Sequence, residues 1–218
     1  MKKREHKYII GIDEVGRGPL AGPVAIGVVR LKVESLKINT KWGKDFRDSK
    51  KLSAKAREAW FVKIEEARSE GWLEYAVAFV APSVIDKRGI VYAINAAIFR
   101  ALKIVDSPVP APRQSSHVTC QLSSLVLLDG GLRAPAHYPH QQTIIKGDEK
   151  ELVIALASIV AKVTRDRRMV ALAKKFPAYG FEKHKGYGTR AHYEAIKKHG
   201  ITPHHRRSFL GLLTRSVK

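Results

Sequence analysis

The sequence contains a single cysteine, Cys120, and has no uninterrupted run of about 20 apolar residues. One thiol excludes an internal disulfide and any metal cluster built from several cysteines. The lack of a long apolar run argues against a membrane-spanning helix, and residues 1–6 lack the apolar core of a signal peptide. We therefore expect a soluble, cytoplasmic protein.

Acidic residues are also scarce, because 20 Asp and Glu stand against 40 Lys and Arg, which gives a net charge of +20 in 218 residues. Such an excess of positive charge attracts polyanions. Nucleic acid is the expected partner, and an anionic membrane surface is the alternative. No repeat or long linker divides the chain, so we expect one domain, residues 1–218, large enough to bury a full core.

The hydrophobic pattern mixes strands with helices, which is typical of an α/β fold. Apolar runs predict strands over residues 8–12, 24–29, 73–80, 125–128 and 143–145. A Gly/Pro-rich turn separates the first two strands and predicts an antiparallel pair. Helices are predicted over residues 53–68, with Ser53 as N-cap and Gly71 as the stop, and over 90–102. The Pro-rich residues 107–124 are expected to form a long loop.

Acidic side chains follow three of these apolar strands. Asp13 and Glu14 end the first strand and precede a Gly16-Arg17-Gly18 turn, while Asp129 and Asp148 follow later strands. Strand ends at one edge of a sheet bring such side chains together. Four converging carboxylates repel one another unless cations hold them, and their oxygens suit two Mg²⁺ or Mn²⁺ ions.

The neighbouring acids on the first strand set a geometric condition. Adjacent residues of a regular strand face opposite sides of the sheet. Glu14 can therefore join Asp13 only if the backbone turns at this point and the longer side chain reaches back. The glycines that follow make such a turn feasible.

Eight sequence blocks, in order from about residue 8 to residue 209, resemble the ribonuclease HII family. They are GIDEVGRGPLAG (11–22), DSKKLS (48–53), LDG (128–130), KGD (146–148), ASIVAKVTRD (157–166), YGF (179–181), HKGY (184–187) and HHRRSF (204–209). The resemblance implies a ribonuclease H-like α/β fold with a mixed central sheet flanked by helices. It also implies that a helical and loop segment, about 176–218, completes the substrate site.

The resemblance implies a role for each matching residue. The metal-binding carboxylates would be Asp13, Glu14, Asp129 and Asp148. Backbone groups of Gly16, Arg17 and Gly18 would contact the 2′-hydroxyl of a ribonucleotide, and Tyr187 would pack against the sugar of the next nucleotide. Phosphate contacts would come from Ser49 and Lys50.

Two positions depart from the family pattern. Gly188 stands where the family usually has proline after the Gly-Tyr pair, and Leu156 stands where it usually has alanine. The first departure predicts a looser loop around Tyr187. Neither position is a predicted metal ligand.

The expected activity is that of an endoribonuclease that uses two metal ions. It would cut the RNA strand of RNA/DNA hybrids and cut at ribonucleotides embedded in duplex DNA, leaving 3′-hydroxyl and 5′-phosphate ends. We expect a monomer, and no peptide that would bind a replication clamp is evident after Phe209. The alternatives are another two-metal nuclease of the same fold and a non-catalytic basic nucleic-acid-binding protein.

Three further features have simpler interpretations. Asp166 lies among arginines and is expected to form an i,i+4 ion pair rather than to bind metal. The adjacent His204 and His205 have poor spacing for zinc and predict a basic face or a phosphate contact. Tyr179 and Phe181 are expected to be core or loop anchors.

Overall fold

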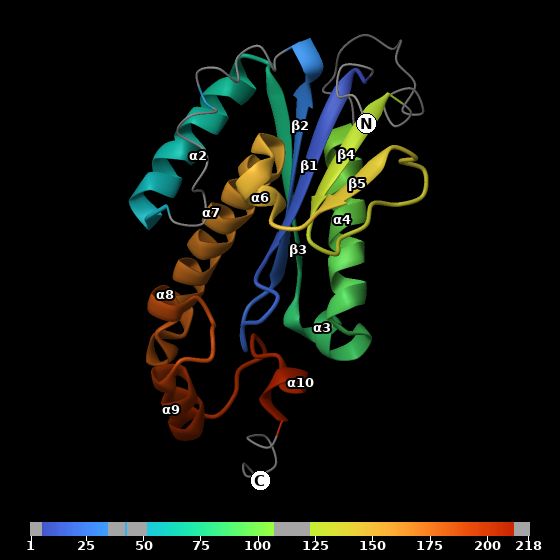
Figure 1. The fold of residues 1–218 in the computed structure, drawn as a ribbon. Coiled ribbons are helices and arrows are strands. Elements are labelled where there is room, and N and C mark those ends of the chain that lie inside the picture. Colours follow the sequence, from blue (N-terminus) through green and yellow to red (C-terminus); the bar gives the residue numbers. More distant parts are fainter. Residues whose placement is uncertain (1–5, 35–41, 43–51, 107–122, 212–218) are drawn as a thin grey trace.

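The computed structural model describes residues 6–34, 42, 52–106 and 123–211, which form a five-stranded sheet with helices on both faces (Figure 1). The strand order is β3-β2-β1-β4-β5. The strands are β1 (Tyr8–Val15), β2 (Val24–Lys32), β3 (Leu73–Val80), β4 (Ser124–Asp129) and β5 (Gln141–Ile144). Strand β2 runs antiparallel to both β1 and β3, whereas β1, β4 and β5 run parallel to one another, so the sheet is mixed.

The alternation of side chains along the strands divides the core into two layers. Ile10 and Ile12 of β1 pack with α4 (Ile90–Asp106) on one face. Ile9 faces the other side, where α2 (Ala54–Ser69) and the long α7 (Leu152–Lys175) cover the sheet (Figure 1). Asp13 follows Ile9 by four residues, so the period of two directs its side chain toward the α7 face.

Helix α7 lies unusually close to the centre of the sheet because glycines face it. A Cβ atom on Gly27, which pairs with Asp13 across the β1–β2 ladder, would lie 2.2 Å from the carbonyl oxygen of Ala157. Only a residue without a side chain fits such an approach. The absence of a side chain at this position brings Ser158, the next residue of α7, to the level of Asp13.

The C-terminal elements pack beyond one end of the sheet, against the last turns of α7 and the loop after β1 (Figure 1). A third buried cluster joins Leu20 of that loop to Met169 of α7 and to Tyr179 and Phe181. The elements are η4 (Pro177–Tyr179), α8 (Phe181–His184), α9 (Arg190–His199) and α10 (Arg207–Leu210). The remaining helices are α3 (Pro82–Arg88) and α6 (Gly147–Lys150).

Most element predictions are confirmed. The first two strands form the expected antiparallel pair, and Ser53 caps α2 by accepting a hydrogen bond from the Ala56 N–H at 3.2 Å. The expected loop falls almost entirely on residues 107–122, which lie outside the described residues, as do Ser49 and Lys50. No helix in the described parts of the chain is long and apolar enough to cross a bilayer.

The backbone turn that would bring Glu14 to the same face as Asp13 does not occur at these two residues. Instead, β1 continues in regular pairing through Val15, opposite Ala25. The chain turns only at Gly16, whose φ is +85°. The antiparallel ladder with β2 holds the backbone extended past the two acids, so their side chains start on opposite faces.

Candidate active site

Asp13 is a buried carboxylate at the centre of the sheet, with 4% of its surface exposed. The parallel neighbour β4 ends in Asp129, in register one step beyond the Ile12–Leu128 pair. The pKa of Asp13 is raised from 3.8 to about 7, chiefly because burial disfavours the charged form. A hydrogen bond with the Ser158 side chain lowers this pKa, while the charges of Asp129 and Glu14 raise it. An uncompensated buried carboxylate of this kind is a typical functional-site feature.

Glu14 begins on the opposite face but stays within the electrostatic reach of Asp129. Its Oε1 lies 3.4 Å from the Arg17 guanidinium, and its buried Oε2 has no hydrogen-bond partner among the described residues. Burial raises the pKa of Glu14, while the hydrogen bond and charge of Arg17 lower it. The buried oxygen is an acceptor that a cation could satisfy.

Asp129 and Asp148 are joined through a backbone amide. The N–H of Gly147 donates to Asp129 Oδ1 at 2.7 Å, and Asp148 is the next residue, buried at the start of α6. Lys146 turns the chain into this helix with a φ of +54°. The short helix therefore places Asp148 directly behind the end of β4.

The charges of Asp129 and Glu14 act on Asp13, and the charge of Asp129 acts on Glu14, while Asp148 follows the residue whose amide binds Asp129. Among the described residues, no three or more acidic, histidine or cysteine side chains are placed so that they could hold one metal ion together. Two of the carboxylates accept backbone hydrogen bonds: Asp13 Oδ1 accepts from the Glu14 N–H at 2.8 Å, and Asp129 Oδ1 accepts from the Gly147 N–H. A donor set made only of carboxylate oxygens still fits a hard divalent cation.

The Gly16-Arg17-Gly18 turn is held by a buried arginine from the far end of the chain. Arg206 donates from Nη2 to the Gly16 carbonyl at 2.6 Å, from Nη1 to the Arg17 carbonyl at 2.8 Å and from Nε to the Gly22 carbonyl at 3.0 Å. The side chain of Arg17 itself is 57% exposed. The backbone of the turn is thus fixed while its side chain faces solvent.

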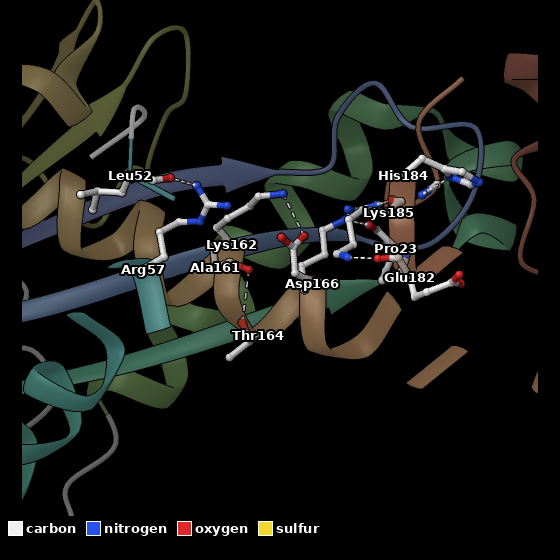
Figure 2. A network of polar contacts seen from close by, with 12 residues as sticks. Pro23, Leu52, Arg57, Ala161, Lys162, Thr164, Asp166, Glu182, His184 and Lys185 are labelled. Carbon is white, nitrogen blue, oxygen red and sulfur yellow. Dashed lines mark hydrogen bonds and ion pairs between the residues drawn. The ribbon is translucent and has the colours of Figure 1, made fainter. Parts of the chain in front are cut away.

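A second buried arginine, Arg165 of α7, ties the next part of this loop to the segment that carries Tyr187. It donates to the carbonyls of Pro23 at 2.9 Å and Lys185 at 3.1 Å, and Figure 2 shows these two residues close together. The Gly186 carbonyl also accepts the Leu20 N–H at 2.8 Å. These bonds bring the turn after β1 and residues 185–189, hereafter the Tyr187 loop, into one unit.

Tyr187 itself is 43% exposed, so its ring is available to a ligand. Gly186 allows the loop to pass close to the turn, since a Cβ atom there would lie 2.2 Å from the Ala21 carbonyl oxygen at a φ of +86°. Gly188, at the position where the family usually has proline, packs against Tyr193 and Leu20. The loop is anchored by these contacts and by the bonds of Arg165.

Comparison with known proteins identifies the family. The family model described as ribonuclease HII matches residues 10–211. The chain belongs to the ribonuclease HII family. It is 44% identical over 202 residues to the ribonuclease HII of Endomicrobium trichonymphae, covering 92% of this chain and 84% of that one.

Solved structures agree with this assignment. The ribonuclease H2 of Pyrococcus horikoshii OT3 superposes with a TM-score of 0.66 at 26% identity, covering 92% of this chain and 93% of that one. The ribonuclease HII of Archaeoglobus fulgidus, solved in complex with PCNA, gives a TM-score of 0.64 at 25% identity, covering 91% and 93%. The predicted ribonuclease H-like fold is confirmed. As a member of the ribonuclease HII family, the chain is a ribonuclease H-type endonuclease.

Sequence analysis missed three residues of this ribonuclease HII site: Ser158, Arg165 and Arg206. All three lie in blocks that carry the family resemblance, but nothing in the pattern separates buried Arg206 from its exposed neighbour Arg207. Arg165 stands in a run of basic residues that reads as a solvated helix face. Burial of an arginine among backbone carbonyls has no local sequence signal.

Of the predictions for Asp166 and His205, the first is confirmed and the second is wrong. Asp166 forms the expected i,i+4 ion pair, with Lys162 Nζ 2.8 Å from its Oδ1, as Figure 2 shows. The expectation of a basic face is wrong for His205, which is 2% exposed, and burial with the neighbouring His192 lowers its pKa to about 4. The Thr202 N–H and the surrounding rings hold this histidine in the interior instead.

Proposed function

We propose that this chain hydrolyses the RNA strand of RNA/DNA hybrids and cuts at ribonucleotides embedded in duplex DNA. The observation that supports this proposal most directly is that buried Asp13 of β1 and half-buried Asp129 of β4 lie close to a turn whose backbone is fixed by Arg206. Chemistry and ribose recognition then occur within a few residues of one another. The net charge of +20 supports a nucleic-acid substrate.

Asp13, Glu14, Asp129 and Asp148 would hold two divalent ions, Mg²⁺ or Mn²⁺. Such ions supply activation of a water molecule and stabilisation of the leaving 3′-oxygen, which yields 3′-hydroxyl and 5′-phosphate ends. The raised pKa of Asp13 and the unbonded Oε2 of Glu14 among the described residues support this role. Ser158 orients Asp13 by its hydrogen bond, and the Gly147 N–H orients Asp129.

Discrimination of RNA from DNA requires contact with the 2′-hydroxyl, which is the local difference between the two. In our proposal the backbone of Gly16, Arg17 and Gly18 makes this contact, and Arg206 fixes its geometry. The exposed ring of Tyr187 packs against the sugar of the next nucleotide. Ser49 and Lys50, outside the described residues, are proposed phosphate contacts, and we propose a single domain that acts as a monomer.

Three substrates test this function: a DNA duplex with one ribonucleotide, an RNA/DNA hybrid and an all-DNA duplex, each with Mg²⁺, Mn²⁺ or EDTA. We expect cleavage of the first two in either metal, with 3′-hydroxyl ends, and none in EDTA. Asp166→Asn serves as a control that removes an acid outside the proposed ligand set. Cutting of the all-DNA duplex, or cutting in EDTA, would refute the proposal.

A further inference from the structure

Three buried or half-buried histidines lie in contact beneath the Tyr187 loop, outside the carboxylate site. His184 and His192 stack with ring centroids 4.4 Å apart, and the Nε2 atoms of His192 and His205 are 3.1 Å apart. His192 Nδ1 lies 2.9 Å from the Tyr187 carbonyl oxygen. The rings therefore connect the C-terminal segment to the backbone of the proposed sugar-contacting residue.

The partners of these rings define where each proton lies. The Thr202 N–H donates to His205 Nδ1 at 2.9 Å, so neutral His205 carries its proton on Nε2. That proton points to His192 Nε2, which must accept it. His192 then carries its proton on Nδ1, where the Tyr187 carbonyl oxygen accepts it. We call the path from Thr202 through His205 and His192 to Tyr187 the histidine chain.

His184 has a fixed tautomer of its own beside this chain. Its Nε2 lies 2.7 Å from the Tyr179 carbonyl oxygen, so it donates there, and its Nδ1 accepts the Gly186 N–H at 3.2 Å. Gly186 also bonds to Leu20 through its carbonyl. Gly186, the residue before Tyr187, is thus tied both to a histidine and to the turn after β1.

The charged groups around the histidine chain favour neutral rings. Burial lowers the pKa values of His192 and His205. The neighbouring histidines lower both pKa values further, because they oppose a second positive charge. The buried guanidiniums of Arg165 and Arg206 lie under the same loop, and His204 adds to the effect on His205. The rings of Tyr179, Phe181 and His184 pack around the chain.

We propose that His192 and His205 are positioning residues that act through Tyr187. Their directed path of hydrogen bonds, together with the Thr189 N–H at 2.8 Å, holds the Tyr187 carbonyl so that the exposed ring stands where it packs against the sugar. This proposal rests on the proposed function of Tyr187. A doubly protonated pair would place two N–H groups against each other at 3.1 Å, so the path works only with neutral rings.

Substitutions at His192 separate positioning from simple filling of space. His192→Phe keeps the ring volume but removes the donor, whereas His192→Asn offers an amide N–H in place of Nδ1–H. For cleavage of a DNA duplex with one ribonucleotide, we expect His192→Phe to lower kcat/KM roughly five- to tenfold, the effect of one lost hydrogen bond. His192→Asn should recover most of that loss. His199→Phe, the same change elsewhere on α9, is the matched control and should leave kcat/KM unchanged.

A double-mutant cycle tests whether the effect passes through Tyr187. In the Tyr187→Ala background, His192→Phe should cause no further loss, because the ring that the histidine chain positions is already absent. Equal losses in both backgrounds would overturn the positioning role. If Tyr187→Ala alone leaves cleavage unchanged, the assignment of Tyr187 fails and the proposal with it; if Tyr187→Ala impairs cleavage and His192→Phe does not, only the proposal fails.

A spectroscopic measurement tests the histidine chain without any reference to nuclease activity. Imidazole ¹⁵N–¹H NMR of the full chain should show His192 as the Nδ1–H tautomer, and His205 and His184 as Nε2–H tautomers. The neutral states of His192 and His205 should persist at pH 6, where an ordinary histidine with a pKa of about 6.5 is mostly protonated. Nε2–H on His192, or protonated His205 at pH 6, would overturn the proposal even for an active enzyme.

Discussion

Arg206 Nη2 donates a hydrogen bond of 2.6 Å to the carbonyl oxygen of Gly16, a residue 190 positions earlier in the chain. The planar guanidinium reaches two successive carbonyls of the turn at once, which a lysine ammonium cannot reproduce in the same geometry. The C-terminal segment thereby determines the backbone conformation of the turn that we propose senses the ribose.

Arg206→Lys should lower both stability and cleavage. Loss of the fork leaves buried carbonyls without donors, at a cost of about 1–3 kcal/mol. In a chain of this size, each kcal/mol lowers the melting temperature by roughly 2–4 °C. Arg207→Lys, the same change at the exposed neighbour, should leave both nearly unchanged. Equal effects of the two substitutions, measured by thermal melts and by turnover of the single-ribonucleotide duplex, would contradict the role of Arg206.

Sequence periodicity predicted the sheet because its signals are local. Apolar runs and caps such as Ser53 depend on neighbouring residues, and each has a counterpart among the described elements. The convergence of Asp13 and Asp129 also follows from strand direction alone, since β1 and β4 are parallel. The family resemblance then supplied the roles that spacing could not.

The parts that could not be predicted depend on contacts between distant segments. Whether β1 ends at Asp13 or continues to Val15 depends on pairing with β2. Burial of His205 depends on how α9 and the Tyr187 loop fold back over it. A basic residue has the same sequence appearance on a surface as in an interior lined by carbonyl oxygens, so Arg165 offered no clue.

Gly27→Ala should push α7 away from the sheet and disturb the Asp13 site. The new Cβ would overlap the Ala157 carbonyl oxygen, and overpacking of this kind costs about 1–3 kcal/mol. Because Ser158 follows Ala157, its bond to Asp13 should lengthen and turnover should fall. Gly131→Ala, at a position with open space, is the control for glycine replacement. Crystal structures or turnover measurements that show no change in Gly27→Ala would refute the close-approach argument.

Asp13→Asn should abolish cleavage while making the metal-free protein more stable at neutral and alkaline pH. The pKa of Asp13 is raised from 3.8 to about 7, so its favourable contribution to folding is complete below pH 3.8 and is lost as pH rises to about 7. The asparagine variant lacks this loss. In EDTA, its melting temperature relative to the unsubstituted protein should therefore increase from pH 4 to pH 8, and duplex binding should persist. A constant difference across this range would contradict the raised pKa.

The last prediction concerns which acid completes the metal site. Asp148 is buried at the start of α6, next to the amide that binds Asp129, whereas Asp166 lies on α7 in an ion pair with Lys162. A buried carboxylate close to the end of β4 suits a cation, whereas the charge of Asp166 is compensated by Lys162.

Asp148→Asn should therefore slow cleavage by more than the roughly 10- to 100-fold that loss of an outer partner of a metal ligand costs, and should raise the Mg²⁺ concentration required. Asp166→Asn should cost less than about 1 kcal/mol of stability, because its partly exposed ion pair is weakened by solvent, and should leave turnover intact. Turnover against Mg²⁺ concentration and a thermal melt for each variant make the comparison. An active Asp148→Asn together with an inactive but equally stable Asp166→Asn would place the fourth carboxylate on α7 instead.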